Sequence, residues 1–200
     1  MAGANCAYAL SKRGLACTIY CQDDALAKGA SGNAQGGFYP QLNAEAGHAS
    51  QIHGLSFNFA NTQYRQLLSQ GIHFSHQWCG TLQLAFNEKV ATRYRKLIHN
   101  QTWPDALVHW VEPQQATQLA NVDLPYPGLY IEQGGWINLP ELVAGLTKAA
   151  GSTIANNKQL TSLEQVDDTW QLSWQDGGQS EADIVIMATG SDSPLCEQMS

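Results

Sequence analysis

A glycine-rich stretch near the N-terminus is the densest group of residues that could take part in chemistry. Residues 29–37 read Gly-Ala-Ser-Gly-Asn-Ala-Gln-Gly-Gly and contain no bulky apolar side chain. Such a segment forms neither a core strand nor a stable helix, so its backbone N–H groups stay available as hydrogen-bond donors. The pattern predicts a loop that exposes its backbone to a ligand, with an ordinary surface turn as the alternative.

A single glycine, Gly3, begins a run of small residues in a predicted helix over residues 3–14. Residues 15–20 follow as a short apolar run, typical of a buried parallel strand. In a Gly-x-Gly-x-x-Gly turn that binds a dinucleotide, the third glycine lets the first helix pack closely on the sheet, and the helix N-terminus faces the pyrophosphate. Gly3 fits that third position, with the first strand and two glycines expected before Met1. Alone, an ordinary helix start explains Gly3 equally well.

Two further segments could contact such a nucleotide. At the end of the second strand an acid usually holds the ribose hydroxyls. Here Cys21 occupies that place, and Asp23 is the nearest substitute. Near the C-terminus, the apolar residues 184–187 predict a buried strand. That strand leads into three small residues that would pass close to a cofactor: Ala188, Thr189 and Gly190.

The elements that must position these residues alternate between helix and strand. Apolar spacing and turn residues predict helices over residues 45–70, 88–99, from Pro113 onward, and 138–150. They predict strands over residues 81–86, 128–132, 159–166, 169–174 and 182–187. Parallel-type strands with helices, mixed with antiparallel hairpins, indicate an α/β fold with α+β elements and two intermixed subdomains.

Composition narrows the class of protein. Hydrophobic residues at 44% predict a globular core, and the net charge of -7 does not favour a nucleic-acid surface. The local exception is a basic cluster on the predicted helix 88–99, for which a solvated helix face is the alternative: Lys89, Arg93, Arg95 and Lys96. No apolar run is long enough to cross a bilayer and no signal-peptidase site follows the first segment, so we expect a cytoplasmic protein. Five scattered cysteines, Cys196 among them, fit reduced thiols.

Three blocks of sequence carry a resemblance to a known family. They are residues 29–42, 79–89 and 130–138, within a similarity that runs from Gly3 to about Gly190. The chain resembles the D-amino-acid-oxidase-like FAD-dependent oxidoreductases. Within that group it is similar to the C-terminal oxidoreductase domain of the bifunctional tRNA 5-methylaminomethyl-2-thiouridine biosynthesis proteins, the MnmC family.

The resemblance implies an enzyme that binds FAD and removes the carboxymethyl group from 5-carboxymethylaminomethyl-(2-thio)uridine at the tRNA wobble position, leaving the 5-aminomethyl form. The cofactor carries the oxidation, so no nucleophile or catalytic triad is expected and the catalytic residues stay unknown. It further implies tRNA as substrate, an upstream methyltransferase domain and no membrane association. The alternatives are an amino-acid oxidase of the glycine or sarcosine oxidase type, or a noncatalytic module with a truncated dinucleotide fold.

The same resemblance implies the site residues. The FAD contacts are expected at Gly3, Cys21, Asp23, Ala30, Ser31, Gly32, Asn33, Gln35, Gly36, Gly37, Leu160, Ala188, Thr189 and Gly190. The substrate-side residues are expected at Gly134, Gly135 and Trp136, for which a plain hairpin is the alternative.

The expected domain plan is an incomplete Rossmann-like parallel sheet with an intermixed antiparallel substrate subdomain. We expect residues 1–44 to form a partial FAD-binding subdomain without its first strand, and residues 45–150 a substrate or cap subdomain. Residues 151–200 would return to the FAD-binding subdomain and end before it is complete. Because the closest pyrophosphate contacts would then be missing, we expect FAD to be absent or poorly bound and the chain weakly active or inactive.

A possible metal site is the remaining candidate. His73, His76 and Cys79 are spaced by three residues and could converge on a metal ion if they lay on a helix. No fourth ligand is evident, so we expect a structural cluster and no metal.

Overall fold

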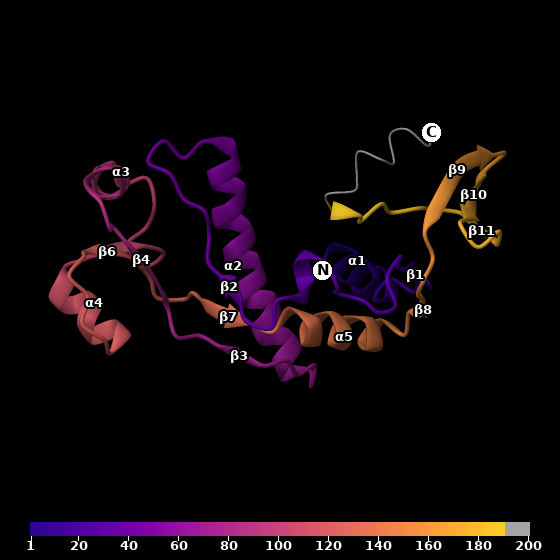
Figure 1. The fold of residues 1–200 in the computed structure, drawn as a ribbon, viewed down its shortest axis with the longest axis horizontal. Coiled ribbons are helices and arrows are strands. Elements are labelled where there is room, and N and C mark those ends of the chain that lie inside the picture. Colours follow the sequence, from indigo (N-terminus) through magenta and orange to yellow (C-terminus); the bar gives the residue numbers. More distant parts are fainter. Residues whose placement is uncertain (191–200) are drawn as a thin grey trace. The chain divides into compact units, whose positions relative to one another are not determined.

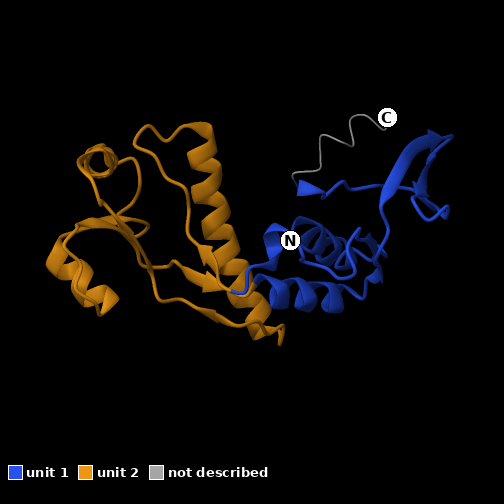
Figure 2. Cartoon of the chain, viewed as in Figure 1, with its two compact units in different colours: residues 1–34, 139–200 blue, residues 35–138 orange. Residues whose placement is uncertain are grey.

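The computed structural model describes residues 1–190 (Figure 1). The chain divides into two compact units (Figure 2). Unit 1 is Met1–Ala34 together with Leu139–Ser200, and unit 2 is Gln35–Asn138. Residues 35–44 therefore group with unit 2 and residues 139–150 with unit 1. The mixed α/β class, with one parallel and several antiparallel sheets, confirms the predicted fold class.

Of the apolar run 15–20, only residues 18–20 form a strand, and none of the six residues is buried, so the predicted burial of this strand is wrong. Unit 1 begins with the predicted helix and this shorter strand. Its first elements are α1 (Ala2–Ser11), β1 (Thr18–Tyr20), the short 3-10 helix η1 (Ala30–Gly32), α5 (Leu139–Ala150) and β8 (Thr153–Ala155). β1 and β8 pair in parallel, from Thr18 opposite Thr153 to Tyr20 opposite Ala155. The two helices pack on one another, and the buried face of α5 is made by Leu142, Val143 and Leu146.

A three-stranded antiparallel meander completes the described part of unit 1. It comprises β9 (Leu160–Val166), β10 (Thr169–Trp174) and β11 (Gln179–Ala182), in the order β11-β10-β9. The Trp174 ring stacks on Tyr20 at 4.3 Å between ring centroids, which ties the meander to the end of β1. The two predicted hairpin strands are therefore confirmed, with the turn at Asp176 and Gly177 between β10 and β11.

The predicted buried strand over residues 184–187 is wrong. The chain there is extended but belongs to no strand, and Ile184 and Ile186 are 73% and 50% exposed. An extended segment becomes a strand only when a neighbouring strand accepts its hydrogen bonds. Within residues 1–190, β1 pairs only with β8, so no ladder takes up residues 184–187.

Unit 2 contains two three-stranded antiparallel sheets and three helices. One sheet has the order β2-β7-β3, from β2 (Gly36–Phe38), β7 (Gly135–Ile137) and β3 (His76–Gln77). The other has the order β4-β6-β5, from β4 (Thr81–Leu84), β6 (Gly128–Ile131) and β5 (His109–Val111). The helices are α2 (His48–Ser69), α3 (Glu88–His99) and α4 (Pro113–Ala120).

Local chemistry explains where these helices begin. α2 starts at His48 because Ala46 has a φ of 45°, a left-handed conformation that a helix cannot continue. The Asn87 side chain accepts a hydrogen bond from the Val90 N–H and caps α3. Among residues 1–190, no helix is both long and apolar enough to cross a membrane.

The core of unit 2 forms where α2 meets both sheets. Phe38 stacks near Phe57, with ring centroids 4.7 Å apart, and the same core includes buried Val108, Leu129 and Ile131. A core of aromatic and branched side chains packs densely and fixes the position of the strands around it. The β2-β7-β3 sheet is thereby covered on its Phe38 side.

Candidate cofactor and substrate sites

The N-terminus of α1 is the first candidate anion site. The backbone N–H groups of its first turn have no acceptor inside the helix; the N–H of Asn5 is the first to donate back, to the Met1 carbonyl at 3.1 Å. Ala2, Gly3 and Ala4 place no large or acidic side chain there. Exposed N–H donors and the positive end of the helix dipole favour a phosphate group.

Gly3 and Ala188 meet at this helix start. A Cβ atom built on Gly3 would lie 3.4 Å from the Ala188 Cβ, an ordinary van der Waals distance. The segment that ends in Ala188, Thr189 and Gly190 therefore runs against the first turn of α1. Gly3 and residues 188–190, which the sequence predicts as cofactor contacts, are far apart along the chain but lie side by side in the structure.

The glycine loop, residues 29–37, also contacts the start of α1. The Met1 amino group donates to the Ser31 hydroxyl at 3.1 Å, and the Leu139 N–H donates to the Asn33 carbonyl at 3.3 Å. A Cβ atom on Gly32 would lie only 2.8 Å from the Ala27 carbonyl oxygen, so a side chain there would force the loop to move. Burial lowers the pKa of the Met1 amino group.

The end of β1 is held by the strand beside it. The Cys21 N–H donates to the Ala155 carbonyl at 2.9 Å, and the Cys21 thiol lies 3.5 Å from the Ala25 carbonyl that it donates to. The Asp23 carbonyl accepts from the Asn157 N–H at 2.9 Å. These bonds fix the backbone of the predicted ribose site. Leu160 opens β9 opposite Trp174, and its contact with an adenine ring stays a prediction.

These residues fit the nucleotide part of FAD. The uncapped start of α1, the backbone of residues 29–33 and the small residues 188–190 make a place without acids or bulky side chains, which suits a pyrophosphate. Ala30 and Ser31 lie in η1 within that set. The chain's own residues would hold the phosphates through backbone N–H groups and would place Cys21 and Asp23 toward the ribose.

The remaining predicted residues lie in unit 2, on adjacent strands. Gly36 pairs with Ile137, and Gly37 pairs with Trp136. Gln35 is the first residue of unit 2 and directly precedes β2. Gly37, predicted as a cofactor contact, and Trp136, predicted as a substrate contact, are therefore directly opposite one another in one antiparallel pair of strands.

The two glycines before Trp136 are needed for packing. A Cβ atom on Gly135 would overlap the Gln77 carbonyl oxygen, and one on Gly134 would lie 2.5 Å from the Thr81 hydroxyl oxygen. Neighbouring atoms within unit 2 therefore account for glycine at both positions, from the Gln77 backbone at Gly135 and from the Thr81 side chain and Ile131 backbone at Gly134. Close approach to a flavin ring is not required to explain them.

Two residues beside Gly37 and Trp136 were not among the site residues predicted from the sequence, namely Tyr39 and Gln77. Tyr39 follows β2 directly and is 40% exposed, and the Gln77 side chain accepts a hydrogen bond from the Trp136 indole N–H at 3.4 Å. Strand alternation could have indicated Tyr39, because it lies two residues after Gly37 and so falls on the same face. Gln77 could not be found without the register of β3.

The basic cluster on α3 is partly neutralised. Arg95 pairs with Glu88 at 3.0 Å and Lys96 pairs with Glu45 at 2.5 Å, and Lys96 holds the pKa of the Glu45 carboxyl below its usual value. In the part of the chain that the structure describes, Lys89 and Arg93 form no ion pair. They remain the cations available to an anionic partner.

The histidine and cysteine cluster does not form a metal centre. His76 lies in β3, where its ring is 5.0 Å from the Trp78 ring and its Nδ1 is 2.9 Å from the Phe74 carbonyl oxygen. Over residues 1–190, no group of three His, Cys, Asp or Glu side chains could hold a metal ion. The four cysteines in this range, Cys6, Cys17, Cys21 and Cys79, are free thiols, whereas Cys196 lies outside the described residues.

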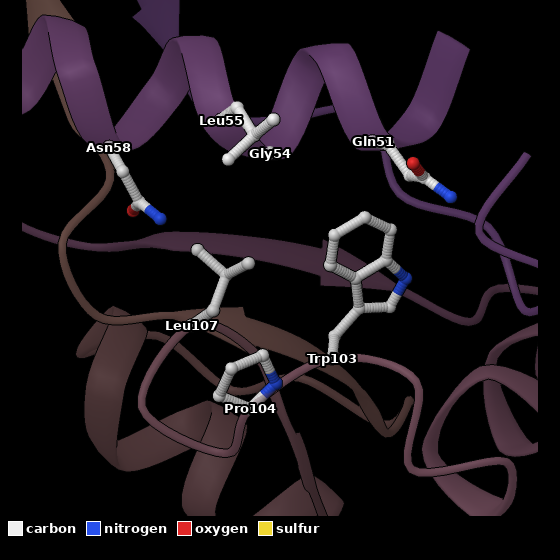
Figure 3. Close-up of a pocket in the computed structure, with 7 residues that line it drawn as sticks. All are labelled: Gln51, Gly54, Leu55, Asn58, Trp103, Pro104 and Leu107. Carbon is white, nitrogen blue, oxygen red and sulfur yellow. The ribbon is translucent and has the colours of Figure 1, made fainter. Parts of the chain in front are cut away.

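An apolar groove of about 260 Å³ lies elsewhere in unit 2. Figure 3 shows Leu55 of α2 and Leu107 facing one another across it, with Trp103 and Pro104 beside them. The Trp103 indole N–H donates to the Asn43 carbonyl at 2.8 Å, which holds the ring in place. The groove contains none of the residues predicted to bind FAD or substrate.

Comparison with known families defines the class of protein. The model of the FAD dependent oxidoreductase family, DAO, matches residues 1–200. The chain therefore belongs to the DAO family of FAD-dependent oxidoreductases, as its sequence blocks predicted.

Curated relatives narrow the resemblance. The chain is 46% identical, over 96% of its length, to the tRNA 5-methylaminomethyl-2-thiouridine biosynthesis bifunctional protein MnmC of Pseudoalteromonas atlantica. It is 41% identical, over 86% of its length, to the protein of the same name from Shewanella frigidimarina. It spans only 30% and 25% of these relatives, respectively. The predicted resemblance to one part of a bifunctional protein is confirmed.

Solved structures confirm the fold. Glycine oxidase from Geobacillus kaustophilus has a TM-score of 0.76 at 22% identity, with 94% of this chain and 52% of that chain covered. The L-alpha-glycerophosphate oxidase from Mycoplasma pneumoniae, solved with FAD bound, has a TM-score of 0.78 at 20% identity, covering 99% of this chain and 54% of that chain.

Proposed function

We propose that this chain acts in the FAD-dependent removal of the carboxymethyl group from 5-carboxymethylaminomethyl-(2-thio)uridine at the tRNA wobble position. The product is the 5-aminomethyl form of the nucleoside. The observation that carries the proposal is the 46% identity, over nearly the whole chain, to a protein named for tRNA 5-methylaminomethyl-2-thiouridine biosynthesis. Membership of an FAD-dependent oxidoreductase family supports oxidation as the type of reaction.

The reaction is the oxidation of an N-substituted glycine. When bound, FAD would supply the acceptor for a hydride from the methylene carbon, and the C=N bond that the substrate nitrogen forms would be hydrolysed by water to a primary amine and glyoxylate. The chain's residues would hold the methylene carbon of the substrate in the orientation needed for hydride transfer. This is the contribution expected of a protein around such a cofactor.

We assign each unit its own role. In unit 1, the α1 N-terminus, the loop around Ser31 and the Ala188 segment would hold the nucleotide of the cofactor. In unit 2, the paired strands that carry Gly37 and Trp136 would contact the substrate or the reacting end of the cofactor. The predicted subdomain roles of residues 1–44, 45–150 and 151–200 belong to this proposal.

The partners follow from the same proposal. We expect tRNA as the substrate, an upstream methyltransferase domain in the complete protein and a cytoplasmic reaction. The word bifunctional in the relatives' names supports a second activity in the complete protein.

A two-part experiment tests the function. The purified chain is titrated with FAD and examined for the yellow flavin absorption band. The enzyme that contains the chain is then incubated with tRNA carrying the carboxymethylaminomethyl nucleoside, and glyoxylate and nucleosides are measured by mass spectrometry. Loss of the carboxymethyl group with equimolar glyoxylate is expected. Oxidation of free glycine or sarcosine, with the tRNA unchanged, would instead favour an amino-acid oxidase. No flavin binding in either protein would favour a noncatalytic module.

A further inference from the structure

One face of the β2-β7-β3 sheet displays a set of uncharged side chains. In antiparallel sheets, residues directly opposite one another project from the same face. Gly37 lies opposite Trp136, and Trp136 lies opposite Gln77 on its other side. These three residues therefore share one face. The opposite face carries Phe38, which packs on Phe57 in the core.

Tyr39 extends the same face beyond the end of β2. Its ring carbon Cε1 would be 2.9 Å from a Cβ atom built on Gly37, so the ring lies over the glycine backbone. Because Gly37 has no side chain, the Tyr39 ring occupies the space into which a side chain at position 37 would project, opposite Trp136 in the ladder. The ring is 40% exposed, although it belongs to a large hydrophobic side chain.

The Trp136 and Gln77 side chains hold one another. The indole N–H donates to the Gln77 Oε1 at 3.4 Å, which restricts the rotation of both groups. The Gln77 amide nitrogen remains a donor at the edge of the face, and its oxygen has a second lone pair. The set, which we call the aromatic face, is Gly37, Tyr39, Gln77 and Trp136.

We propose that the aromatic face binds the uracil ring of the modified nucleoside. A pyrimidine would stack on the rings of Tyr39 and Trp136, and the Gln77 amide would hydrogen-bond to its polar edge. Stacking on aromatic side chains and hydrogen bonds to base edges are the means by which proteins recognise unpaired RNA bases. The face carries no charge, which suits a neutral base better than a phosphate group. This inference rests on the proposed function, which supplies the uridine.

The test measures RNA binding without flavin or turnover. A fluorescently labelled anticodon stem-loop carries either 5-carboxymethylaminomethyluridine or an abasic residue at the wobble position, and anisotropy gives the dissociation constant for the chain. We expect the abasic RNA to bind about tenfold more weakly, as expected for the loss of one stacked base. Tyr39→Ala and Trp136→Leu should weaken binding of the uridine RNA to the same degree, with no further loss on the abasic RNA.

Two substitutions serve as controls. Tyr39→Phe keeps the ring and should retain affinity. Tyr126→Ala removes a tyrosine of similar exposure, 42%, that precedes a strand of the other sheet of unit 2, and should change nothing. Thermal unfolding of each variant separates loss of binding from loss of folding, since Tyr39 is exposed and its removal should leave the melting temperature nearly unchanged.

The outcomes separate this inference from the proposed function. Equal affinity for the uridine and abasic RNAs, or no RNA binding by the chain, overturns the aromatic face as a base site even if the enzyme oxidises tRNA. Base-dependent binding that the Tyr39 and Trp136 variants abolish supports the face even if no oxidation of tRNA is found. In that second case only the proposed reaction fails.

Discussion

The glycine at the start of α1 in unit 1 and the glycines in the strands of unit 2 have different surroundings. In unit 1, Gly3 has ordinary space around its missing side chain, with Ala188 at 3.4 Å. In unit 2, a side chain on Gly135 would overlap the backbone of β3, and one on Gly128 would lie 2.5 Å from the Gln83 carbonyl oxygen. Packing therefore does not require glycine at position 3, whereas it does require glycine at positions 128 and 135 in the sheets of unit 2.

The units also differ in charge. Unit 2 has five Lys and Arg residues against six Asp and Glu, whereas unit 1 has five against eleven. Four of the five cations in unit 2 lie on α3. The positive charge that could attract a polyanion is therefore concentrated on α3 of unit 2.

The largest expected effect comes from filling a crowded glycine in unit 2. Gly135→Ala should lower the free energy of unfolding by about 3 kcal/mol, because the added methyl group forces β3 and β7 apart. Urea denaturation measures the change. Gly29→Ala is the control, since nothing lies within 4 Å of a Cβ atom there, and it should alter stability by less than about 0.5 kcal/mol. If Gly135→Ala were as stable as the unsubstituted protein, the glycines of the two units would not differ in their importance for packing.

The next effect concerns the basic helix. Lys89→Ala combined with Arg93→Ala should weaken binding of tRNA about tenfold and reduce the dependence of affinity on salt, because two phosphate contacts are lost. Filter binding at several salt concentrations measures both quantities. The matched control is Lys12→Ala with Arg13→Ala in unit 1, which also removes two cations. Equal losses in the two double variants would show a general charge effect without a site on α3.

A smaller effect is expected at the uncrowded glycine of unit 1. Gly3→Ala should change the free energy of unfolding by less than about 1 kcal/mol, with stabilisation as the expected direction because alanine favours a helix. Thermal unfolding monitored by circular dichroism at the helix band provides the measurement. A loss as large as that of Gly135→Ala would mean that both glycines serve packing.

The smallest effect is the pH dependence of the meander in unit 1. Lys158 binds Asp176 at 2.5 Å and holds the pKa of that carboxyl below its usual value. A depressed pKa gives stability that is present above the unfolded value near 3.9 and is lost as pH falls through the folded value. Unfolding should therefore become slightly easier below about pH 4. Asp176→Asn should remove that part of the pH profile, while a profile unchanged by the substitution would exclude the pair as its source.

Much of the fold could be predicted because its elements are locally encoded. Helix α3 has the predicted bounds, residues 88–99, since an Asn cap and a regular apolar spacing mark both its start and its face. The glycine loop and the start of α1 were assigned to one site through the family resemblance. The structure brings Ser31 of the loop to the Met1 amino group, and it brings Ala188 to Gly3.

The rest depends on pairing between distant segments. The strand over residues 184–187 failed because an apolar run predicts burial but cannot supply the neighbouring strand that burial requires. The aromatic face was missed for a related reason. Gln77 has no signal of its own in the sequence, and only the register of β3 with β7 brings it beside Trp136.

Residues 183–189 have a practical consequence for anyone who handles the protein. Proteases bind their substrates as extended chains, and nicking concentrates in exposed segments that are not held by a ladder. This segment belongs to no strand and carries exposed Ile184 and Ile186. Limited digestion would therefore begin there, and it would detach the small residues that lie against the first turn of α1 while leaving the helices and the meander intact.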